Sequence, residues 1–168
     1  PEGTALSTQG TMVVEFSFLG GDSTVTTSGR PALVIDGSSG AERAWIYNNA
    51  GAVGGFIRAG SVSQATPLVA GTAAVGVVQK CALTWKANDV QFARNGSHGT
   101  RDVAATMPAL TAIGIGSDSA GAVSGNVIVY GWTIYDDHYP TDAGMDALTT
   151  PTTTRNQSRL TLGLGLGL

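Results

Sequence analysis

The sequence predicts an all-β protein, and three observations support this fold class. Of the 168 residues, 24 are glycine, roughly twice the usual share of about 7%. Charged residues make up only 12% of the chain, and Glu, Lys and Gln, which favour helices, are scarce. Segments in which apolar and polar residues alternate recur along the chain. Since 42% of the residues are hydrophobic, a core can form, and we expect one antiparallel β-sandwich of the jelly-roll type.

Turns rich in Gly, Ser and Asn separate the expected strands. The clearest strand is 77–86, in which Cys81, Leu83 and Trp85 point to one face. The segment 125–137 has apolar residues on both faces, which predicts a central strand covered on both sides. Strands are expected at 11–19, 30–36, 42–49, 52–59, 77–86, 90–96, 98–106, 110–118 and 125–137.

One short helix is expected after Thr141, a good N-cap residue. The letters DAGMDALT place Ala143, Met145 and Leu148 at helical spacing. After Thr149 the composition becomes Thr-rich, which is typical of an extended linker. The predicted domain is therefore 1–149, and 150–168 is predicted to be a tail.

Three pieces of the chain carry a resemblance to a known family. They read KCALTWKANDVQFARNGS, LTAIGIGSDSAG and GNVIVYGWTIYDDHYPTDAGMDALT. A strand ending in an aromatic residue and Lys, an Asn-Asp turn, an Ile-Gly strand and a helix ending in Leu-Thr follow in order. This pattern is similar to the laminin-G-like branch of the concanavalin A-like lectin/glucanase superfamily, over roughly 3–149. The resemblance implies a concanavalin A-like jelly roll, as found in phage head decorations, tails and fibres and in secreted bacterial surface proteins.

Catalysis is not expected from these residues. Hydrolytic members of the superfamily use Glu-x-Asp-x-x-Glu on one strand, whereas Glu2, Glu15 and Glu42 have no partner at that spacing. No Gly-x-Ser-x-Gly elbow or phosphate-binding loop is present. Cys81, the only cysteine, lies in an apolar run and is interpreted as a buried hydrophobic residue.

The sequence predicts neither nucleic-acid binding nor a membrane-spanning helix. The net charge is −3, and the basic residues are dispersed without interleaved aromatic residues. No apolar run approaches the roughly 18 residues that a membrane helix needs. If Pro1 is the natural start, removal of a preceding Met fits synthesis in a host cytoplasm; a fragment of a longer protein is the alternative.

A glycan site and a calcium site are two further hypotheses. Trp45 and Tyr47 share one strand face, and Asn48 and Asn49 end that strand, so together they form a candidate glycan contact. Core packing is the alternative for both aromatic residues. Laminin-G-like domains often hold one Ca²⁺ at a rim, and the resemblance indicates two candidate ligands. They are Asp118 and Asp36, for which turn formation is the alternative.

The chain ends in a stretch with an unusual composition, in which leucine alternates with Thr and Gly. An extended strand of this kind can pair with a sheet edge, so we predict a protein-docking tail. Its residues are Leu160, Leu162, Leu164, Leu166 and Leu168. The first functional hypothesis is a non-catalytic structural protein of a phage virion that contacts other virion proteins and itself and that could also bind glycans. The alternative is an extracellular carbohydrate-binding module for cell-surface glycans, with Ca²⁺ as a candidate cofactor.

Overall fold

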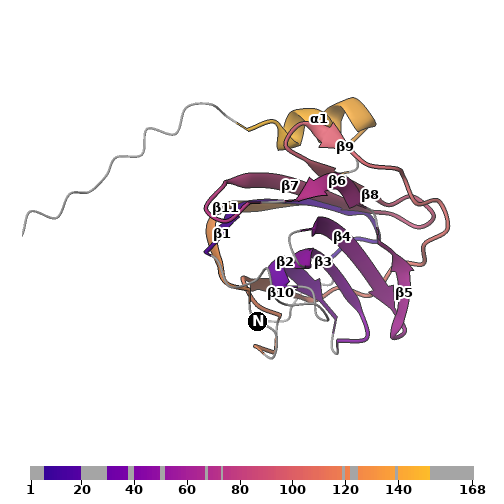
Figure 1. Cartoon of the computed structure of the whole chain (residues 1–168). Helices are drawn as coiled ribbons and strands as arrows, with labels where there is room; N and C mark the ends of the chain where they lie inside the picture. Colours follow the sequence, from indigo (N-terminus) through magenta and orange to yellow (C-terminus); the bar gives the residue numbers. More distant parts are fainter. Residues whose placement is uncertain are drawn as a thin grey trace, which may run out of the picture.

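The computed structural model shows a β-sandwich of two facing antiparallel sheets, with one helix on the outer side (Figure 1). The five-stranded sheet has the order β11 (Val127–Asp136), β1 (Gly10–Phe18), β7 (Gln79–Trp85), β8 (Gln91–Arg94) and β9 (Ser97–His98). The six-stranded sheet has the order β10 (Ala112–Ile115), β2 (Arg30–Asp36), β3 (Arg43–Asn49), β4 (Ala52–Ala59) and β5 (Val62–Ala65), and β6 (Leu68–Thr72) also pairs with β4. The structure describes residues 6–19, 30–37, 40–49, 52–66, 68–72, 74–118, 120–121, 125–138 and 140–151.

The inner faces of the two sheets form the main core. Cys81, Leu83 and Trp85 are fully buried there, which confirms the strand face predicted for β7. Phe16 and Phe18 of β1 meet edge to face, with ring centroids 5.0 Å apart. The predicted all-β sandwich is therefore confirmed.

Helix α1 (Asp142–Thr149) lies on the outer face of the five-stranded sheet (Figure 1). Thr141 is its N-cap, as predicted, and the Gly144 backbone N–H donates to the Thr141 hydroxyl at 3.3 Å. The fully buried Met145 packs against Val13, Ala82 and Ala93, where two alanines leave room for it. In the described part of the chain, no helix has the length and apolar character needed to cross a membrane.

The prediction that 125–137 forms a central strand was wrong. Among the described strands, β11 is at the edge of its sheet, and Trp132 is 44% exposed. Apolar residues on both faces show that a strand can be covered, but they do not specify its neighbours. Two further differences concern short elements. In the region of the strand expected at 98–106, only 97–98 forms a strand. The strands 62–65 and 68–72 were not expected.

Candidate functional site

Three aromatic side chains cluster on the outer face of the six-stranded sheet. Alternation along β3 puts Ala44 and Ile46 in the core and points Trp45 and Tyr47 away from it. Trp45 pairs directly with Phe56 of β4. The ring centroids of Trp45 lie 5.7 Å from Tyr47 and 5.5 Å from Phe56, and those of Tyr47 and Phe56 are 6.4 Å apart. All three side chains are half-buried, so they form a continuous aromatic cluster that still reaches the surface.

Two arginines extend this cluster toward one end of the strands. Arg43 and Arg58 lie directly opposite each other on β3 and β4. The Arg43 guanidinium stands 4.7 Å from the Trp45 ring centroid, and that of Arg58 stands 5.3 Å from the Phe56 centroid. Both distances permit cation–π attraction. We call these five residues the aromatic–arginine face: Arg43, Trp45, Tyr47, Phe56 and Arg58.

The two arginines have different partners. Arg43 is buried and donates from Nε to Asp36 Oδ1 at 2.5 Å and from Nη2 to Asp36 Oδ2 at 3.2 Å. Its Nη2 also lies 3.4 Å from Asp118 Oδ2. Arg58 donates from Nη1 to the Gly40 carbonyl at 3.4 Å and forms no ion pair within the described residues. Arg43 is therefore neutralised within the protein, whereas the charge of Arg58 is available to a ligand.

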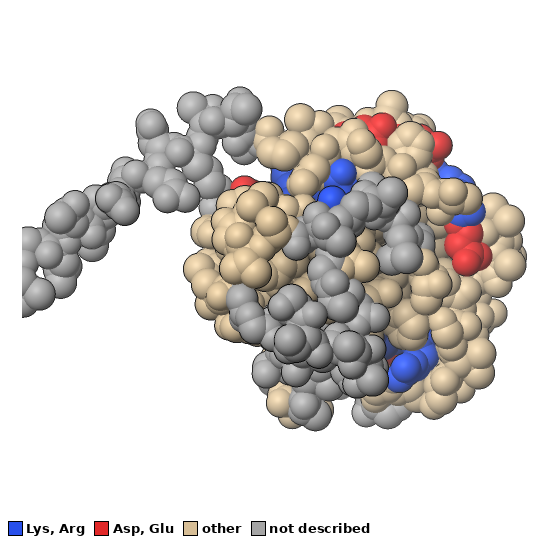
Figure 2. Space-filling model, viewed as in Figure 1, with Lys and Arg blue, Asp and Glu red and all other residues tan. Residues whose placement is uncertain are grey.

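Two buried donors on this face have no acceptor in the part of the chain that the structure describes. They are Trp45 Nε1 and Arg58 Nε. A buried donor without an acceptor costs free energy, typically about 1–3 kcal/mol. In Figure 2 most of the described surface is uncharged, and one of its basic groups lies at the lower right, where β4 and β5 lie in Figure 1.

Tyr47 contributes a hydroxyl group to the same face. Burial raises the pKa of its phenol above the ordinary value. The group therefore stays protonated at neutral pH, so it can both donate and accept a hydrogen bond.

The structure separates the predicted glycan-contact residues. Trp45 and Tyr47 lie on the outer face rather than in the core. Asn48 is 3% exposed, and alternation places it on the inner side of β3. The side chain of Asn49 lies outside the described residues. Sequence reasoning missed Phe56, which reaches this face because the pairing of Asn49 with Ala52 sets a register that puts Phe56 opposite Trp45.

The predicted calcium ligands, Asp36 and Asp118, do come together, but around the guanidinium of Arg43. Both side chains are almost fully buried, at 1% and 6% exposure. The described residues hold no group of three or more His, Cys, Asp or Glu side chains suited to a metal ion. Calcium binding therefore stays a prediction, and a cation at these carboxylates would have to compete with Arg43. The predicted tail leucines, 160–168, lie outside the described residues.

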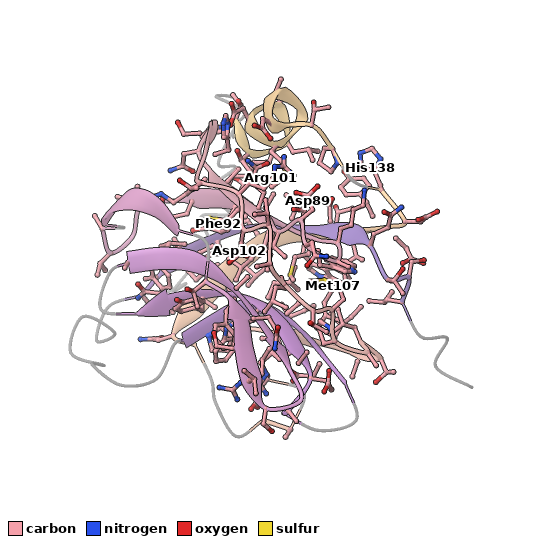
Figure 3. All side chains as sticks on the ribbon, turned by 90° about the vertical axis from the view of Figure 1, so that its right-hand side faces the viewer. Asp89, Phe92, Arg101, Asp102, Met107 and His138 are labelled. Atoms are coloured by element: carbon pink, nitrogen blue, oxygen red, sulfur yellow. The ribbon has the colours of Figure 1, made fainter. Side chains whose placement is uncertain are left out.

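A second polar cluster attaches α1 to the five-stranded sheet. Arg101 forms ion pairs with Asp89 and with Asp142 of α1, and Figure 3 shows Arg101 and Asp89 beneath the helix. His98 Nδ1 lies 2.9 Å from both carboxylate oxygens of Asp146, one turn further along the helix. The hydrogen bond from Arg101 holds the pKa of Asp142 below its usual range. These contacts explain how the helix is fixed in place, and they do not form an arrangement for nucleophilic catalysis.

Comparison with solved structures identifies the same fold in lectin-like domains. The carbohydrate-binding module CBM40 of Ruminococcus gnavus IT-sialidase, bound to alpha2,3 sialyllactose, has a TM-score of 0.63 at 19% identity, over 86% of this chain and 84% of that one. A heptameric SAP-like pentraxin from Limulus polyphemus has a TM-score of 0.64 at 12% identity, over 86% and 72%. Domains LG4-5 of the mouse laminin alpha1 chain give 0.53 at 7% identity, over 77% and 37%. No protein-family model and no curated protein matches the sequence.

Proposed function

We propose that this chain is a non-catalytic module that binds an acidic glycan through the aromatic–arginine face. One observation carries the proposal: the cluster of Trp45, Tyr47 and Phe56 adjoins Arg58, a cation without an ion-pair partner in the described chain. Aromatic rings provide flat apolar surfaces for sugar rings, and a nearby arginine can bind a carboxylate through two parallel hydrogen bonds.

Each residue of the face has a separate function in this proposal. The rings of Trp45 and Tyr47 pack against the C–H face of a sugar. The Arg58 guanidinium, held over Phe56, meets the acidic group. The Tyr47 hydroxyl bonds a sugar hydroxyl. Arg43 does not bind the ligand but fixes the position of Trp45, because Asp36 holds its guanidinium against that ring.

The fold comparison supports this proposal over the structural function in a virion. Jelly-roll neighbours include a carbohydrate-binding module in complex with a sialylated sugar. At identities of 19%, 12% and 7%, the likeness to these neighbours shows the fold alone. The support for glycan binding that comes from this chain itself is the aromatic–arginine face. Assembly with phage proteins and location in a virion stay predictions that come from the sequence resemblance.

A glycan array followed by calorimetry tests the proposal. We expect the full chain to bind carboxylate-bearing glycans in preference to neutral ones, for example sialyllactose in preference to lactose. Arg58→Gln should weaken that binding by about tenfold or more, since it removes a charge-assisted pair. Lys86→Gln, which removes an exposed charge elsewhere, is the matched control and should leave binding unchanged.

Two results would contradict the proposal. Silence of the full chain across an array of acidic and neutral glycans would remove glycan binding altogether. Binding that is unaffected by both Arg58→Gln and Tyr47→Ala would show that the sugar lies elsewhere. Repeating the titration with a chelator separates a calcium-dependent site from the calcium-free site proposed here, because only the former loses affinity.

A further inference from the structure

The edge strand β11 exposes apolar side chains on both of its faces. Within the described chain, β1 is the only strand that pairs with it. Ile128 is 42% exposed, Trp132 44% and Tyr135 38%. From Val127 to Tyr135 the strand contains no charged residue and no proline. The side chains of such a strand are suited to burial, whereas several of them are exposed at this edge in the described part of the structure.

Free strand edges are usually protected against pairing with other chains. Charged side chains, prolines, bulges or a covering segment provide this protection. β11 has one such feature, a bulge at Tyr130, where the register to β1 shifts between Glu15 and Phe16. The helix does not provide a cover, since it packs on β7, β8 and β9. An uncharged edge with exposed Trp and Tyr side chains therefore fits an additional strand.

This chain carries a segment with the pattern of such a strand. Residues 160–168 place leucine at every second position, with Thr161 and three glycines between them. In an extended strand, alternate side chains point to opposite faces, so one face is all leucine and the other is almost bare. The segment lies outside the described residues, which end at Pro151.

The last described residues lie close enough to β11 for this segment to reach it. Lys80 Nζ of β7 donates to the Thr150 carbonyl at 3.4 Å. Lys80 also lines a cavity of about 490 Å³ together with Thr133 and Tyr135 of β11. From β7 across β1 and β11 to an added strand is three strand spacings, about 14 Å. Residues 151–159 can span up to about 30 Å when extended.

We propose that residues 160–168 pair with the outer edge of β11 in the same molecule and extend the five-stranded sheet. The leucine row lies on the core side, where it covers Trp132 and continues the apolar row formed by Val129 and Ile134. The glycine row lies on the outer side, where the absence of side chains leaves room for Tyr130 and Tyr135. A short tether gives the segment a high effective concentration at its own edge, which favours that edge over a second copy.

Amide hydrogen exchange on the full chain tests this pairing. The experiment compares the unchanged chain with the double variant Leu164→Asp, Leu166→Asp, whose charges oppose burial beside Trp132. We expect the β11 amides that point away from β1 to exchange at least about tenfold faster in the variant. The conservative tail variant Thr152→Ser, Thr153→Ser should exchange like the unchanged chain. Sedimentation should show a monomer in every case.

Each other outcome overturns the proposal. Equal exchange of the β11 amides in all three chains would show that the segment does not pair there. Protection of the tail amides without any change in β11 would place the tail on another surface. A dimer that the Asp substitutions convert to a monomer would place the tail on a second copy instead. Glycan binding is independent of these outcomes, because the aromatic–arginine face belongs to the other sheet.

Discussion

Arg43 and Arg58 lie directly opposite each other on β3 and β4, yet of these two arginines only Arg43 forms ion pairs within the described residues. Two like charges at facing positions of a sheet repel each other unless one is neutralised. Asp36 and Asp118 neutralise Arg43. This arrangement leaves Arg58 as the available cation, so Arg43 stabilises the fold, and Arg58 binds the acidic group in the function proposed above.

Replacement of Arg43 should destabilise the fold strongly. Arg43→Met leaves the carboxylates of Asp36 and Asp118 buried without their cation, which typically costs about 3–5 kcal/mol. Urea unfolding measures the loss. Arg58→Met is the matched control, and it should cost less than about 1 kcal/mol because that side chain forms no ion pair in the described chain. Equal losses for the two variants would show that the buried pairs do not stabilise the sandwich.

Acid should loosen the attachment of α1. Since Arg101 lowers the pKa of Asp142 in the folded state, the ionised carboxylate stabilises the folded protein above its unfolded pKa of about 3.9. That contribution disappears as pH falls through the lower folded pKa. NMR titration of the Asp142 carboxyl, with exchange of the α1 amides from about pH 7 to about pH 3, measures both effects. In Arg101→Gln the Asp142 pKa should return toward about 3.9; an unchanged value would refute the assigned cause.

Cys81 should be inert in the folded protein. The side chain is fully buried, and burial raises the pKa of its thiol well above the ordinary value. A thiol reagent at about pH 8 should therefore label the native chain only as fast as it unfolds, and label the urea-unfolded chain at once. Rapid labelling without urea would show that β7 opens locally.

Glycine is required at position 10 because of Trp85. A methyl group there would lie 2.4 Å from the indole ring of Trp85, so Gly10→Ala should cost about 1–3 kcal/mol. Gly131 on β11 has no atom within 4 Å of the same added carbon, and Gly131→Ala is the matched control. Thermal unfolding compares the two variants. Similar melting temperatures would mean that the Trp85 ring moves aside at little cost.

Much of the secondary structure could be predicted because its signals are local. Alternation identified the strands around 11–19, 30–36, 52–59 and 77–86 to within two residues at each end. The cap at Thr141 was predictable for the same reason, since its hydroxyl bonds the backbone three residues away. The short strands 62–65 and 68–72 were missed because they contain few residues with clear alternation.

The candidate site was predictable only in part. Trp45 and Tyr47 share a face in any strand, because they are two residues apart. The contribution of Phe56 and Arg58 depends on the pairing of β3 with β4. Arg43 meets Asp118 from a distant part of the chain, and no pattern near either residue indicates that contact.

The sequence by itself determined where the longer strands and the helix lie and which side chains share a face, since these depend on neighbours along the chain. Only the tertiary structure decided which face meets the other sheet and which strand lies at an edge. Alternation is symmetric: it distinguishes two faces but does not say which one is buried. That choice is made when the sheets pack, and it put Trp45 outside, Cys81 inside and the apolar strand β11 at the rim.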